Sequence, residues 1–471
     1  MKTLVLIPTF NERENISQLL TLLEAEALDV EVLFVDDGSP DGTELEIKRL
    51  AEINPRIHLL QRGGKFGIGS AHRDGIQWAY ANRFDRLVTM DCDLTHLPAD
   101  IPSLITALTD SDVAIGTRYR SPKSLEGWNW RRKCLTRTAH LLTRFFLGLP
   151  YDCTGAFRAY RLDKISEDLF KIVHSPSYPF FFESLFILHH NGFKISEIPI
   201  SLPPRTYGSS KMSPAEPFRG INHLCRMALD RILLPERFGC PKLQLAPNPN
   251  LAPSDGWNAY WERSKESGNL FYKSIATIYR RAVIAPRLTR EIHNLFHQGN
   301  AVLHAGSGSG HVDRSIQSFI KITAVDSSLQ ALDIYRRCVP LASAAVHASV
   351  FELPFKNNTF DGAYHLGVIE HFSPVEIGQF LRELHRVIKP GGRLLIFWPH
   401  QRATSVCVLK IWHHLAGKGA APLHPPEISL AKDKDSVASI LKSSGFDMDS
   451  YSFGIRDFWV QAVIQATRVD D

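Results

Sequence analysis

The stretch VLFVDDGSPDGT, Val32 to Thr43, ends an apolar run in two aspartates and a glycine. Upstream lies a second apolar run, Leu4–Ile7, and the segment between them, residues 14–27, carries apolar side chains at helical spacing. Strand, helix and strand in this order predict a βαβ unit with parallel strands. Acids at the carboxyl ends of such strands lie where α/β sheets bind ligands, so Asp36 and Asp37 suit hydrogen bonds to a base or ribose.

The pattern continues downstream. Residues 86–90 form an apolar run that stops at Asp91-Cys92-Asp93, and residues 113–116 predict a fourth strand. Two carboxylates separated by one residue can reach one divalent cation, which would neutralise a diphosphate leaving group. Taken alone, this pair is a weak signal, because paired acids also occur in solvated turns.

The composition changes after Pro235, where prolines alternate with Asn and Ser up to Gly256. We expect a linker over residues 236–256 that joins a domain of residues 1–235 to one of residues 257–471; a long loop within one domain is the alternative. A second α/β pattern follows. The apolar run 301–305 leads into GSGSG, Gly306–Gly310, and further strands are expected at residues 322–325, 361–366 and 393–398.

Overall composition excludes several classes of protein. The 471 residues carry a formal net charge of +5, which is too mild to indicate a nucleic-acid partner. Seven scattered cysteines without a CxxC pair indicate reduced thiols and favour the cytoplasm. No apolar stretch is long enough to span a bilayer. The mixed basic and apolar segment 131–149 suits either a membrane surface or a buried helix with a solvated face.

Several motifs together point to a family. PTFNE (Pro8–Glu12), the two acidic stretches, IGTRY (Ile115–Tyr119), RRKCLTR (Arg131–Arg137), DCTGAFRAYR (Asp152–Arg161) and RTYGSSKMS (Arg205–Ser213) come in that order. Over residues 1–235 they resemble the dolichol- or polyprenyl-phosphate mannose synthases, which are family 2 glycosyltransferases of GT-A fold. The resemblance implies inverting transfer of mannose from GDP-mannose to dolichyl or polyprenyl phosphate, with Mg²⁺ or Mn²⁺. A different donor such as UDP-glucose is the alternative.

The same resemblance assigns roles to individual residues. Catalytic roles fall to Asp91, Asp93 and Arg131, and metal binding falls to Asp91, Asp93 and Thr95. A phosphate acceptor is already an anion at neutral pH, so Glu183 is open to two interpretations, a base or a structural anchor. The residues implied in donor binding are Pro8, Phe10, Glu12, Val35, Asp37, Cys92, Arg118, Arg205 and Lys211. Cys92, Thr136 and His140 depart from the residues usual in the family.

Residues 257–471 resemble class I S-adenosyl-L-methionine-dependent methyltransferases with a Rossmann-like fold. The glycine stretch, FELPFKNNTFDGAYHLGVIEHF (Phe351–Phe372) and LHRVIKPGGRLLI (Leu384–Ile396) carry this resemblance. It implies that S-adenosyl-L-methionine binds at Gly306, Gly308, Gly310, Asp326 and His371, with a sugar or lipid of the same pathway as methyl acceptor. His304 and Ser349 replace acids usual in the family, which leaves a non-catalytic binding or scaffold domain as the alternative. For a hydroxyl acceptor the candidate bases are Glu370, His371 and His311.

Segment 218–238, where many relatives carry membrane-spanning helices, contains six charged side chains. We therefore expect a catalytic subunit that contacts the cytoplasmic face of a membrane peripherally. A membrane-anchoring subunit is a further expected partner, and a nucleic acid is not.

Overall fold

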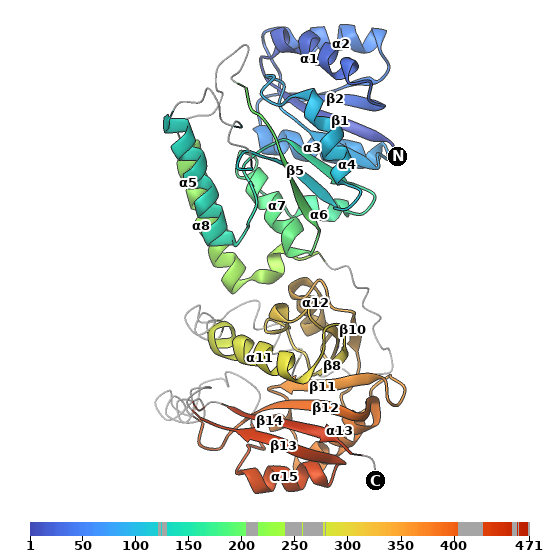
Figure 1. Ribbon diagram of the computed structural model, residues 1–471, viewed down its shortest axis with the longest axis vertical. Helices are drawn as coiled ribbons and strands as arrows, with labels where there is room; N and C mark the ends of the chain where they lie inside the picture. The colour runs from blue at the N-terminus through green and yellow to red at the C-terminus, as the bar shows by residue number, and fades with distance from the viewer. Residues whose placement is uncertain are drawn as a thin grey trace. The chain divides into compact units, whose positions relative to one another are not determined.

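The computed structural model describes residues 1–120, 130–203, 215–240, 279–403, 427–454 and 461–469, with Ser124, Trp257, Thr277 and Trp459. The chain forms two compact units, an N-terminal unit of Met1–Phe238 and a C-terminal unit of Gly239–Asp471 (Figure 1). Each unit has its own seven-stranded sheet, so the α/β fold class predicted for both halves is confirmed. Residues 241–256 of the expected linker lie outside the described residues.

The sheet of the N-terminal unit has the strand order β3-β2-β1-β4-β6-β5-β7. β1, β2, β3 and β4 are parallel, β6 is antiparallel to its neighbours β4 and β5, and β7 pairs parallel to β5. The pairing of β1 with β2 and β4 brings the ends of the three predicted strands to one edge. The strands are β1 (Thr3–Thr9), β2 (Val30–Asp36), β3 (Ile57–Gln61), β4 (Arg86–Thr89), β5 (Val113–Thr117), β6 (Arg158–Arg161) and β7 (Ile195–Pro199).

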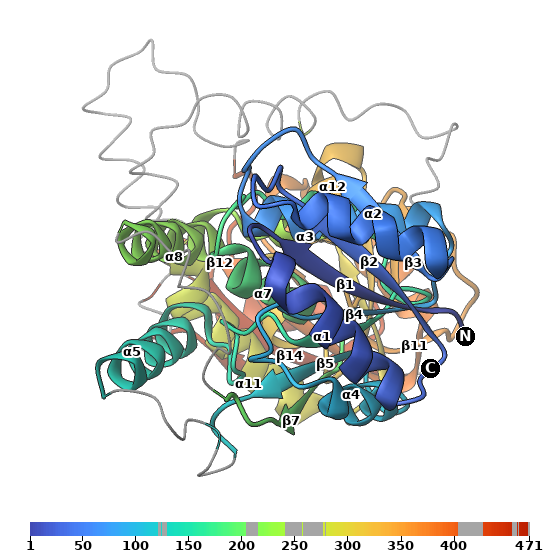
Figure 2. The same cartoon turned by 90° about the horizontal axis from the view of Figure 1, so that it is seen from above.

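Helices cover both faces of this sheet, and Figure 2 shows α1 and α3 on opposite sides of β1. The buried side of α1 packs with α2 and α4 over Val5, Ile7 and Phe34. On the other face Gly75 of α3 lets the helix close on β1, because a Cβ there would lie 2.3 Å from Leu6 Cδ1. The helices are α1 (Arg13–Ala25), α2 (Thr43–Ile53), α3 (Ile68–Ala81), η1 (Pro98–Asp100), α4 (Ile101–Ala107), α5 (Trp130–Leu147), α6 (Glu167–Lys171), α7 (Phe180–His190), α8 (Glu216–Leu233) and η2 (Pro235–Phe238).

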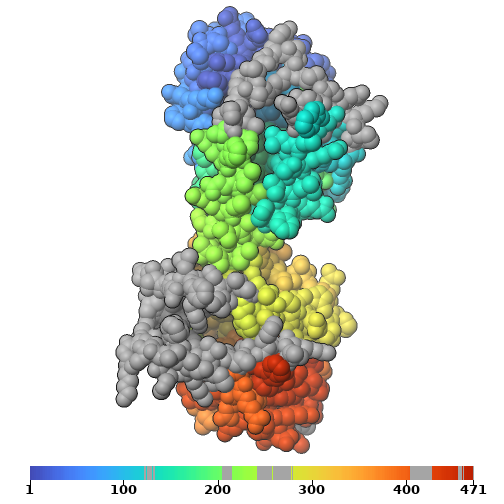
Figure 3. Space-filling view, turned by 90° about the vertical axis from the view of Figure 1, so that its left-hand side faces the viewer, coloured from blue at the N-terminus to red at the C-terminus, as the bar shows by residue number. Residues whose placement is uncertain are grey.

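α5 and α8 lie side by side (Figures 1 and 2). Arg231 Nη1 near the end of α8 donates to the carbonyl of Phe146 near the end of α5 at 3.0 Å. Each helix exposes several large apolar side chains, and Figure 3 shows the two helices adjacent on one face of this unit. We call the exposed apolar residues of the two helices the α5–α8 surface: Trp130, Leu135, Leu141, Phe145, Phe218, Ile221, Leu229 and Ile232.

The compact N-terminal unit extends to Phe238, a little past the expected boundary at residue 235. Phe238 is buried, and its ring packs edge-on against Phe186 with the centroids 4.9 Å apart. Its carbonyl accepts a hydrogen bond from Asn191 Nδ2 at 2.7 Å. These contacts hold η2 against α7, because a buried aromatic side chain outweighs the local preference of the proline-rich stretch for an open chain.

The sheet of the C-terminal unit has the order β10-β9-β8-β11-β12-β14-β13. The strands from β10 to β12 are parallel, and β14 is antiparallel to β12 and β13. Residues 389–392, which precede the strand expected at 393–398, are part of β12, whose register against β11 shifts between Phe360 and Gly362. The strands are β8 (Ala301–Ala305), β9 (Lys321–Asp326), β10 (Ala344–His347), β11 (Phe360–Leu366), β12 (Ile388–Pro399), β13 (Phe446–Ser452) and β14 (Gln461–Arg468).

Side-chain caps begin several helices of the C-terminal unit. Ser328 Oγ accepts from the backbone of Ala331 at the start of α12, and Ser373 and Glu376 form a capping box at the start of α13. Two buried clusters fill the two faces of the sheet. The helices are η3 (Arg280–Ile284), α11 (Ala285–Leu295), η4 (Asp313–Ser315), α12 (Leu329–Cys338), η5 (Ile369–His371), α13 (Pro374–Val387) and α15 (Lys434–Lys442).

Candidate active sites

A pocket of about 420 Å³ lies at the carboxyl ends of the parallel strands of the N-terminal unit. Most of the residues expected in donor and metal binding line it, which places them in one cavity although they come from four strand ends. The expected residues in its wall are Pro8, Phe10, Glu12, Asp37, Asp91, Cys92, Asp93, Thr95 and Arg118.

The two neighbouring aspartates at the end of β2 have different surroundings. Asp36 accepts hydrogen bonds from Thr9 Oγ1 at 3.0 Å and from the amide and hydroxyl of Ser39, so it fixes the loop after β2. Asp37 lines the pocket and accepts from Arg62 Nη1 at 2.6 Å. Burial raises the pKa of Asp37 by more than the charge of Arg62 lowers it. Of the two, Asp37 alone lines the pocket.

The acidic stretch after β4 is held in a tight turn. Asp93 Oδ1 accepts from the hydroxyl of Thr95 at 2.6 Å and from its amide at 3.2 Å, with Leu94 in the left-handed region at φ 61°. The amide of Asp91 donates to Nδ1 of His96 at 2.9 Å, and the His96 ring stacks on Phe157. The turn therefore presents two carboxylates to the pocket from a rigid backbone, as a cation site requires.

Arg118, expected to bind phosphate, is paired inside the protein. Its Nε donates to Asp152 Oδ2 at 2.8 Å, and its Nη2 donates to Asp152 Oδ1 and to Thr154. Burial alone would raise the pKa of Asp152, but the charge and hydrogen bonds of Arg118 hold it below its ordinary value. The guanidinium lines the pocket, yet its charge is balanced before any ligand arrives.

Two cations that the sequence reasoning missed also line the pocket. Lys65 comes from the loop after β3, and its Nζ lies 4.3 Å from the centroid of the Phe10 ring. Arg219 comes from the first turn of α8 and is largely exposed, with Nη1 3.2 Å from Glu216 Oε1. Ser177 Oγ donates to Glu216 Oε2 at 2.6 Å and joins the pocket wall to α8. A glycine-rich loop, RGGKFGIG at residues 62–69, was the available signal for Lys65.

Glu183 is a structural anchor. Its carboxylate accepts from the amides of His174 and Ser175 at 3.1 and 2.9 Å, and from His223 Nε2 at 3.1 Å. Burial would raise its pKa, but these hydrogen bonds and the His223 contact hold it below the ordinary value. The side chain does not line the pocket, so the alternative of a base acting on an acceptor there is not supported.

The C-terminal unit has a pocket of about 570 Å³ at the end of β8. Gly306, Gly308 and Gly310 all have positive φ. A Cβ on Gly306 would lie 2.5 Å from Val368 Cγ2, and one on Gly310 would lie 2.4 Å from Tyr335. Glycines at positions 306 and 310 therefore let this loop pass close to Val368 and Tyr335.

Asp326, at the end of β9, is enclosed by the same loop. Its carboxylate accepts from the amides of Gly308 and Ser328 at 2.8 Å each. Burial raises its pKa, which these hydrogen bonds only partly offset. The loop, Asp326 and Ser349 line one cavity, as the sequence predicts for a nucleoside-binding site.

His304, the residue that replaces the usual acid before the glycine loop, contacts another acid. Its Nδ1 lies 2.6 Å from Oδ2 of Asp313, which is 0% exposed, and Tyr335 donates its hydroxyl to the same oxygen at 2.7 Å. The His304 ring also stacks on Tyr364 with centroids 4.3 Å apart. A carboxylate is thus present behind the pocket although position 304 carries none.

The segment after β11 gives different surroundings to the candidate bases. His371 lines the pocket with its ring edge-on to Trp257, whereas Glu370 lies behind the wall and is fully buried. Burial raises the pKa of Glu370 to about 8.

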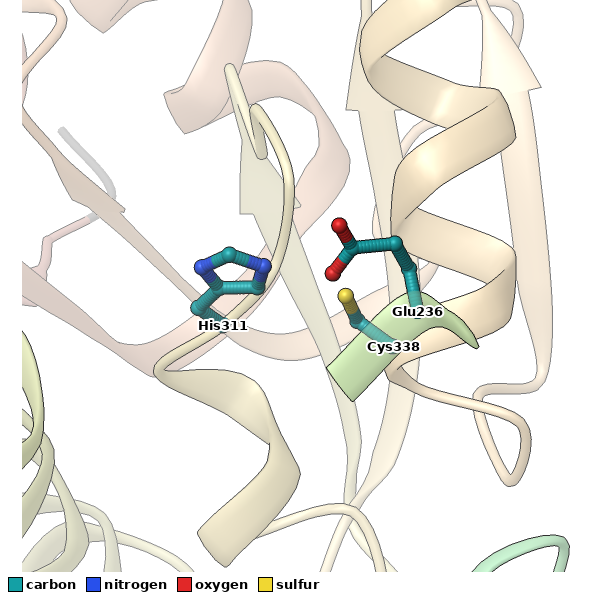
Figure 4. Close-up of side chains that lie close together, drawn as sticks. All are labelled: Glu236, His311 and Cys338. Atoms are coloured by element: carbon teal, nitrogen blue, oxygen red, sulfur yellow. The ribbon is translucent and has the colours of Figure 1, made fainter. Parts of the chain in front are cut away.

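His311, the third candidate base, follows the glycine loop and lines the pocket (Figure 4). Cys338, drawn in the same figure, is the last residue of α12. Glu236, also drawn there, belongs to the N-terminal unit, whose position relative to this one is not determined.

Comparison with known proteins finds a matching family for each unit. The family described as glycosyl transferase family 2 matches residues 4–169, and a methyltransferase domain matches residues 303–396. The polyprenol monophosphomannose synthase of Mycolicibacterium smegmatis is 38% identical over 215 residues, 45% of this chain and 81% of that protein. The chain belongs to glycosyl transferase family 2.

A second relative of this family 2 glycosyltransferase is the undecaprenyl-phosphate mannosyltransferase of Micrococcus luteus, 36% identical over 214 residues, 45% of this chain and 88% of that protein. Among solved structures, a SAM-dependent methyltransferase of Methanosarcina mazei is 19% identical and covers 38% of this chain and 97% of its own, with a TM-score of 0.32. The expected order of a family 2 glycosyltransferase followed by a methyltransferase domain is confirmed.

The structure does not place every residue expected to act in this glycosyltransferase at its pocket. Val35 is fully buried inside β2, and its side chain packs within the unit. Arg131 is on α5, but its side chain lies outside the described part of the structure. Arg205 and Lys211 also fall outside the described residues. In the methyltransferase domain Gly306, Gly308, Gly310, Asp326 and His371 all line one pocket.

Proposed function

We propose that the N-terminal unit transfers a mannosyl group from GDP-mannose to a polyprenyl or dolichyl phosphate, with inversion. The similarity to two polyprenyl-phosphate mannosyltransferases supports the substrate class. The observation that carries the proposal is the convergence of Asp37, Asp91 and Asp93 with Lys65 and Arg219 on one cavity. Carboxylates there suit a cation and a ribose, and side-chain cations suit the phosphates.

The donor end of the pocket is the acidic one. Asp37, fixed by Arg62, would accept hydrogen bonds from the nucleoside. Asp91, Asp93 and Thr95 offer the hard oxygen atoms that Mg²⁺ or Mn²⁺ prefers, so the residues present fit a divalent cation. When bound, such an ion neutralises the charge of the leaving diphosphate. The Thr95 hydroxyl, which donates to Asp93, orients that carboxylate.

The part of the pocket that would bind the acceptor phosphate needs positively charged side chains rather than a general base. A phosphate monoester has a second pKa near ~6 and is already nucleophilic at neutral pH. Lys65 and Arg219 line the cavity and would hold the phosphate for in-line attack. Arg118 would contribute mainly by fixing the wall, because Asp152 balances its charge. Arg205, Lys211 and Arg131 remain proposed participants on the family resemblance.

The lipid part of the acceptor would reach the unit at the α5–α8 surface. Phe145 and Phe218 are 81% and 76% exposed, and basic side chains such as Arg137, Arg144 and Arg226 are exposed on the same two helices. Basic and apolar side chains on interfacial helices bind anionic membrane surfaces. α8 also supplies Glu216 and Arg219 to the pocket.

Within the described residues no helix has the length and apolarity to cross a bilayer. We propose, on the α5–α8 surface, peripheral contact with the cytoplasmic face of a membrane, with or without an anchoring subunit.

The C-terminal unit is proposed to bind S-adenosyl-L-methionine and to methylate a sugar or lipid hydroxyl of the same pathway. The glycine loop and Asp326 line one pocket, and a carboxylate at the end of β9 suits the hydroxyl groups of a ribose. When bound, the cofactor supplies an activated methyl group. His371 lines the pocket and would take the proton of the acceptor hydroxyl. The alternative function is a domain that binds a ligand without catalysis, and it is favoured by His304 and Ser349, which replace acids usual in the family.

Mass spectrometry of the lipid products of one reaction tests both halves. The full chain would be incubated with polyprenyl phosphate, Mg²⁺, S-adenosyl-L-methionine and either GDP-mannose or UDP-glucose. We expect a hexosyl lipid from GDP-mannose that gains one methyl group. A hexosyl lipid from UDP-glucose alone would overturn the donor, and none from either would overturn the transferase proposal. A hexosyl lipid without methyl, together with no S-adenosylhomocysteine formed on any added acceptor, would favour the scaffold.

A further inference from the structure

A π-helical turn, η3, precedes α11 at the wall of the C-terminal pocket. The amide of Ala285 donates to the carbonyl of Arg280, five residues earlier in the chain. Such turns are rare, and they occur frequently at functional sites. Tyr279, Arg280 and Ile284 from this segment line the pocket, whereas Arg281 lines a separate hollow. Two neighbouring arginines therefore face different cavities.

Arg280 brings a permanent positive charge to the pocket, because a guanidinium stays protonated in proteins. Histidines apart, the other charged side chain among the described lining residues is Asp326, which already accepts from two backbone amides. No carboxylate that the structure describes is paired with Arg280, whereas Arg287 on α11 pairs with Glu291 at 2.8 Å. A cation among largely apolar side chains attracts an anion more strongly than the same cation in water does.

The proposed base and several aromatic side chains share this pocket with Arg280. His371 lines it, with the Trp257 ring edge-on at a centroid distance of 5.0 Å, and Tyr279 and Phe372 add further aromatic surface. In such pockets a few charged or polar groups fix the orientation of a ligand that is otherwise held by apolar contacts. An anionic group bound at Arg280 would therefore orient an acceptor whose hydroxyl lies at His371.

The second hollow beside η3 is basic as well. Arg281 and Arg290 line it, and its described lining residues include no carboxylate. Positive charge around a cavity raises the local concentration of anionic substrates. The product proposed for the N-terminal unit is such an anion, because a hexosyl phosphate lipid carries a phosphodiester.

We propose that Arg280 binds the phosphate of the methyl acceptor, so that the C-terminal unit methylates hexosyl phosphate lipids in preference to neutral glycosides. A guanidinium offers parallel N–H donors that match two phosphate oxygens. Arg280 is a substrate-binding residue in this assignment, and it moves neither the methyl group nor the proton. The inference rests on the proposed methyl transfer and names the substrate class of that site.

Two acceptors that differ only in the phosphate test the inference on the full chain. A short prenyl mannosyl phosphate and the corresponding prenyl mannoside would each be incubated with S-adenosyl-L-methionine, without a nucleotide sugar, and S-adenosylhomocysteine would be measured. We expect the wild-type kcat/KM to favour the phosphate acceptor about tenfold or more, the range for hydrogen bonds to a charged group. Arg280→Met should lose this preference, mainly through a higher KM for the phosphate acceptor, and Arg280→Lys should keep part of it.

Arg281→Met is the matched control, because Arg281 adjoins Arg280 in the same turn and lines the other hollow. It should keep the wild-type preference, and an equal loss in both variants would overturn the inference. Calorimetry should show that S-adenosylhomocysteine binds Arg280→Met as tightly as wild type, which also reports a folded pocket. Weaker binding of that ligand, with the acceptor preference unchanged, would assign Arg280 to the cofactor and overturn the inference.

The wild-type protein separates failure of this inference from failure of the proposed function. Equal use of the two acceptors would overturn the inference while methyl transfer stands. A prenyl glucuronide is the third acceptor, and its use in preference to the phosphate acceptor would replace the phosphate by a carboxylate and overturn the inference. S-adenosylhomocysteine from none of the three would overturn the proposed methyl transfer, and this inference with it.

Discussion

Arg118 and Asp152 form a buried, two-pronged ion pair across 34 residues of sequence, with Nε to Oδ2 at 2.8 Å. The pair joins the end of β5 to the turn before β6, next to the pocket. Such a pair is sensitive to the loss of either partner, because the survivor is left as an uncompensated buried charge.

Asp152→Asn should therefore destabilise the N-terminal unit by about 3–5 kcal/mol. Urea denaturation followed by a probe of that unit would measure the change. Asp163→Asn is the control, since the Arg161–Asp163 pair is much more exposed and should contribute about 1 kcal/mol or less. Equal small effects for both variants would contradict the structural role of Asp152.

Asp93→Ala should abolish sugar transfer, because the turn loses a carboxylate that Thr95 orients towards the pocket. Transfer of labelled sugar to polyprenyl phosphate is the measurement, with binding of S-adenosylhomocysteine to the same variant expected to be unchanged. Near-normal sugar transfer would show that Asp93 has no part in metal binding.

Gly308→Arg should have the reciprocal effect. An arginine at the positive φ of 53°, in a loop this close to Asp326, would block the cofactor pocket while sugar transfer continues. Gly378→Arg on α13 is the matched control, because nothing lies within 4 Å of a Cβ there. Calorimetry with S-adenosylhomocysteine separates the two variants, and equal binding by both would remove the glycine loop from the site.

Glu370 predicts a pH dependence of stability. In the folded unit burial keeps its proton up to about pH 8, whereas an unfolded chain releases it near 4.5. The unfolded state thus binds fewer protons between these values, so stability falls as pH rises through this window, by up to ~1.4 kcal/mol per pH unit. Glu370→Gln should remove that slope.

Denaturation of the C-terminal unit at pH 5.5 and 7.5 would measure the difference. Glu352→Gln makes the same substitution at an exposed position and should leave the wild-type slope unchanged. A slope that persists in Glu370→Gln would mean that Glu370 is ionised in the folded unit.

The α5–α8 surface predicts binding to anionic lipid vesicles. Replacing Phe145 and Phe218 together by Ser should weaken sedimentation with vesicles about tenfold or more, because large apolar side chains lose their contact with the acyl region. Leu45→Ser with Ile53→Ser is the control on α2, where both side chains are 71% exposed. If both double variants lose binding equally, the surface has no special role.

The elements that sequence could predict are those with a local signal. Three signals are local in the sequence: the apolar runs, the acids that follow them and the GSGSG loop. They were enough to predict the strands and the edge of each sheet at which a pocket lies. The apolar run alone does not separate Asp36 from Asp37, because which side of a strand faces a ligand is decided by the packed sheet. The family resemblance selected Asp37, and Asp37 lines the pocket. Asp152 behind Arg118 and Asp313 behind His304 needed the fold, as did the reach of Arg219 from α8. Val35, which the resemblance places in donor binding, has a fully buried side chain, and its role stays a prediction.

α5 also carries Cys134, which is exposed, whereas Cys92, Cys153 and Cys338 are buried and Cys225 is partly buried. Thiol reagents should therefore reach Cys134 first among these cysteines. An environment-sensitive fluorophore attached there would sit beside the exposed apolar residues of α5 without replacing any of them. Its emission colour would then report, in real time and in the native sequence, when this helix leaves water for lipid.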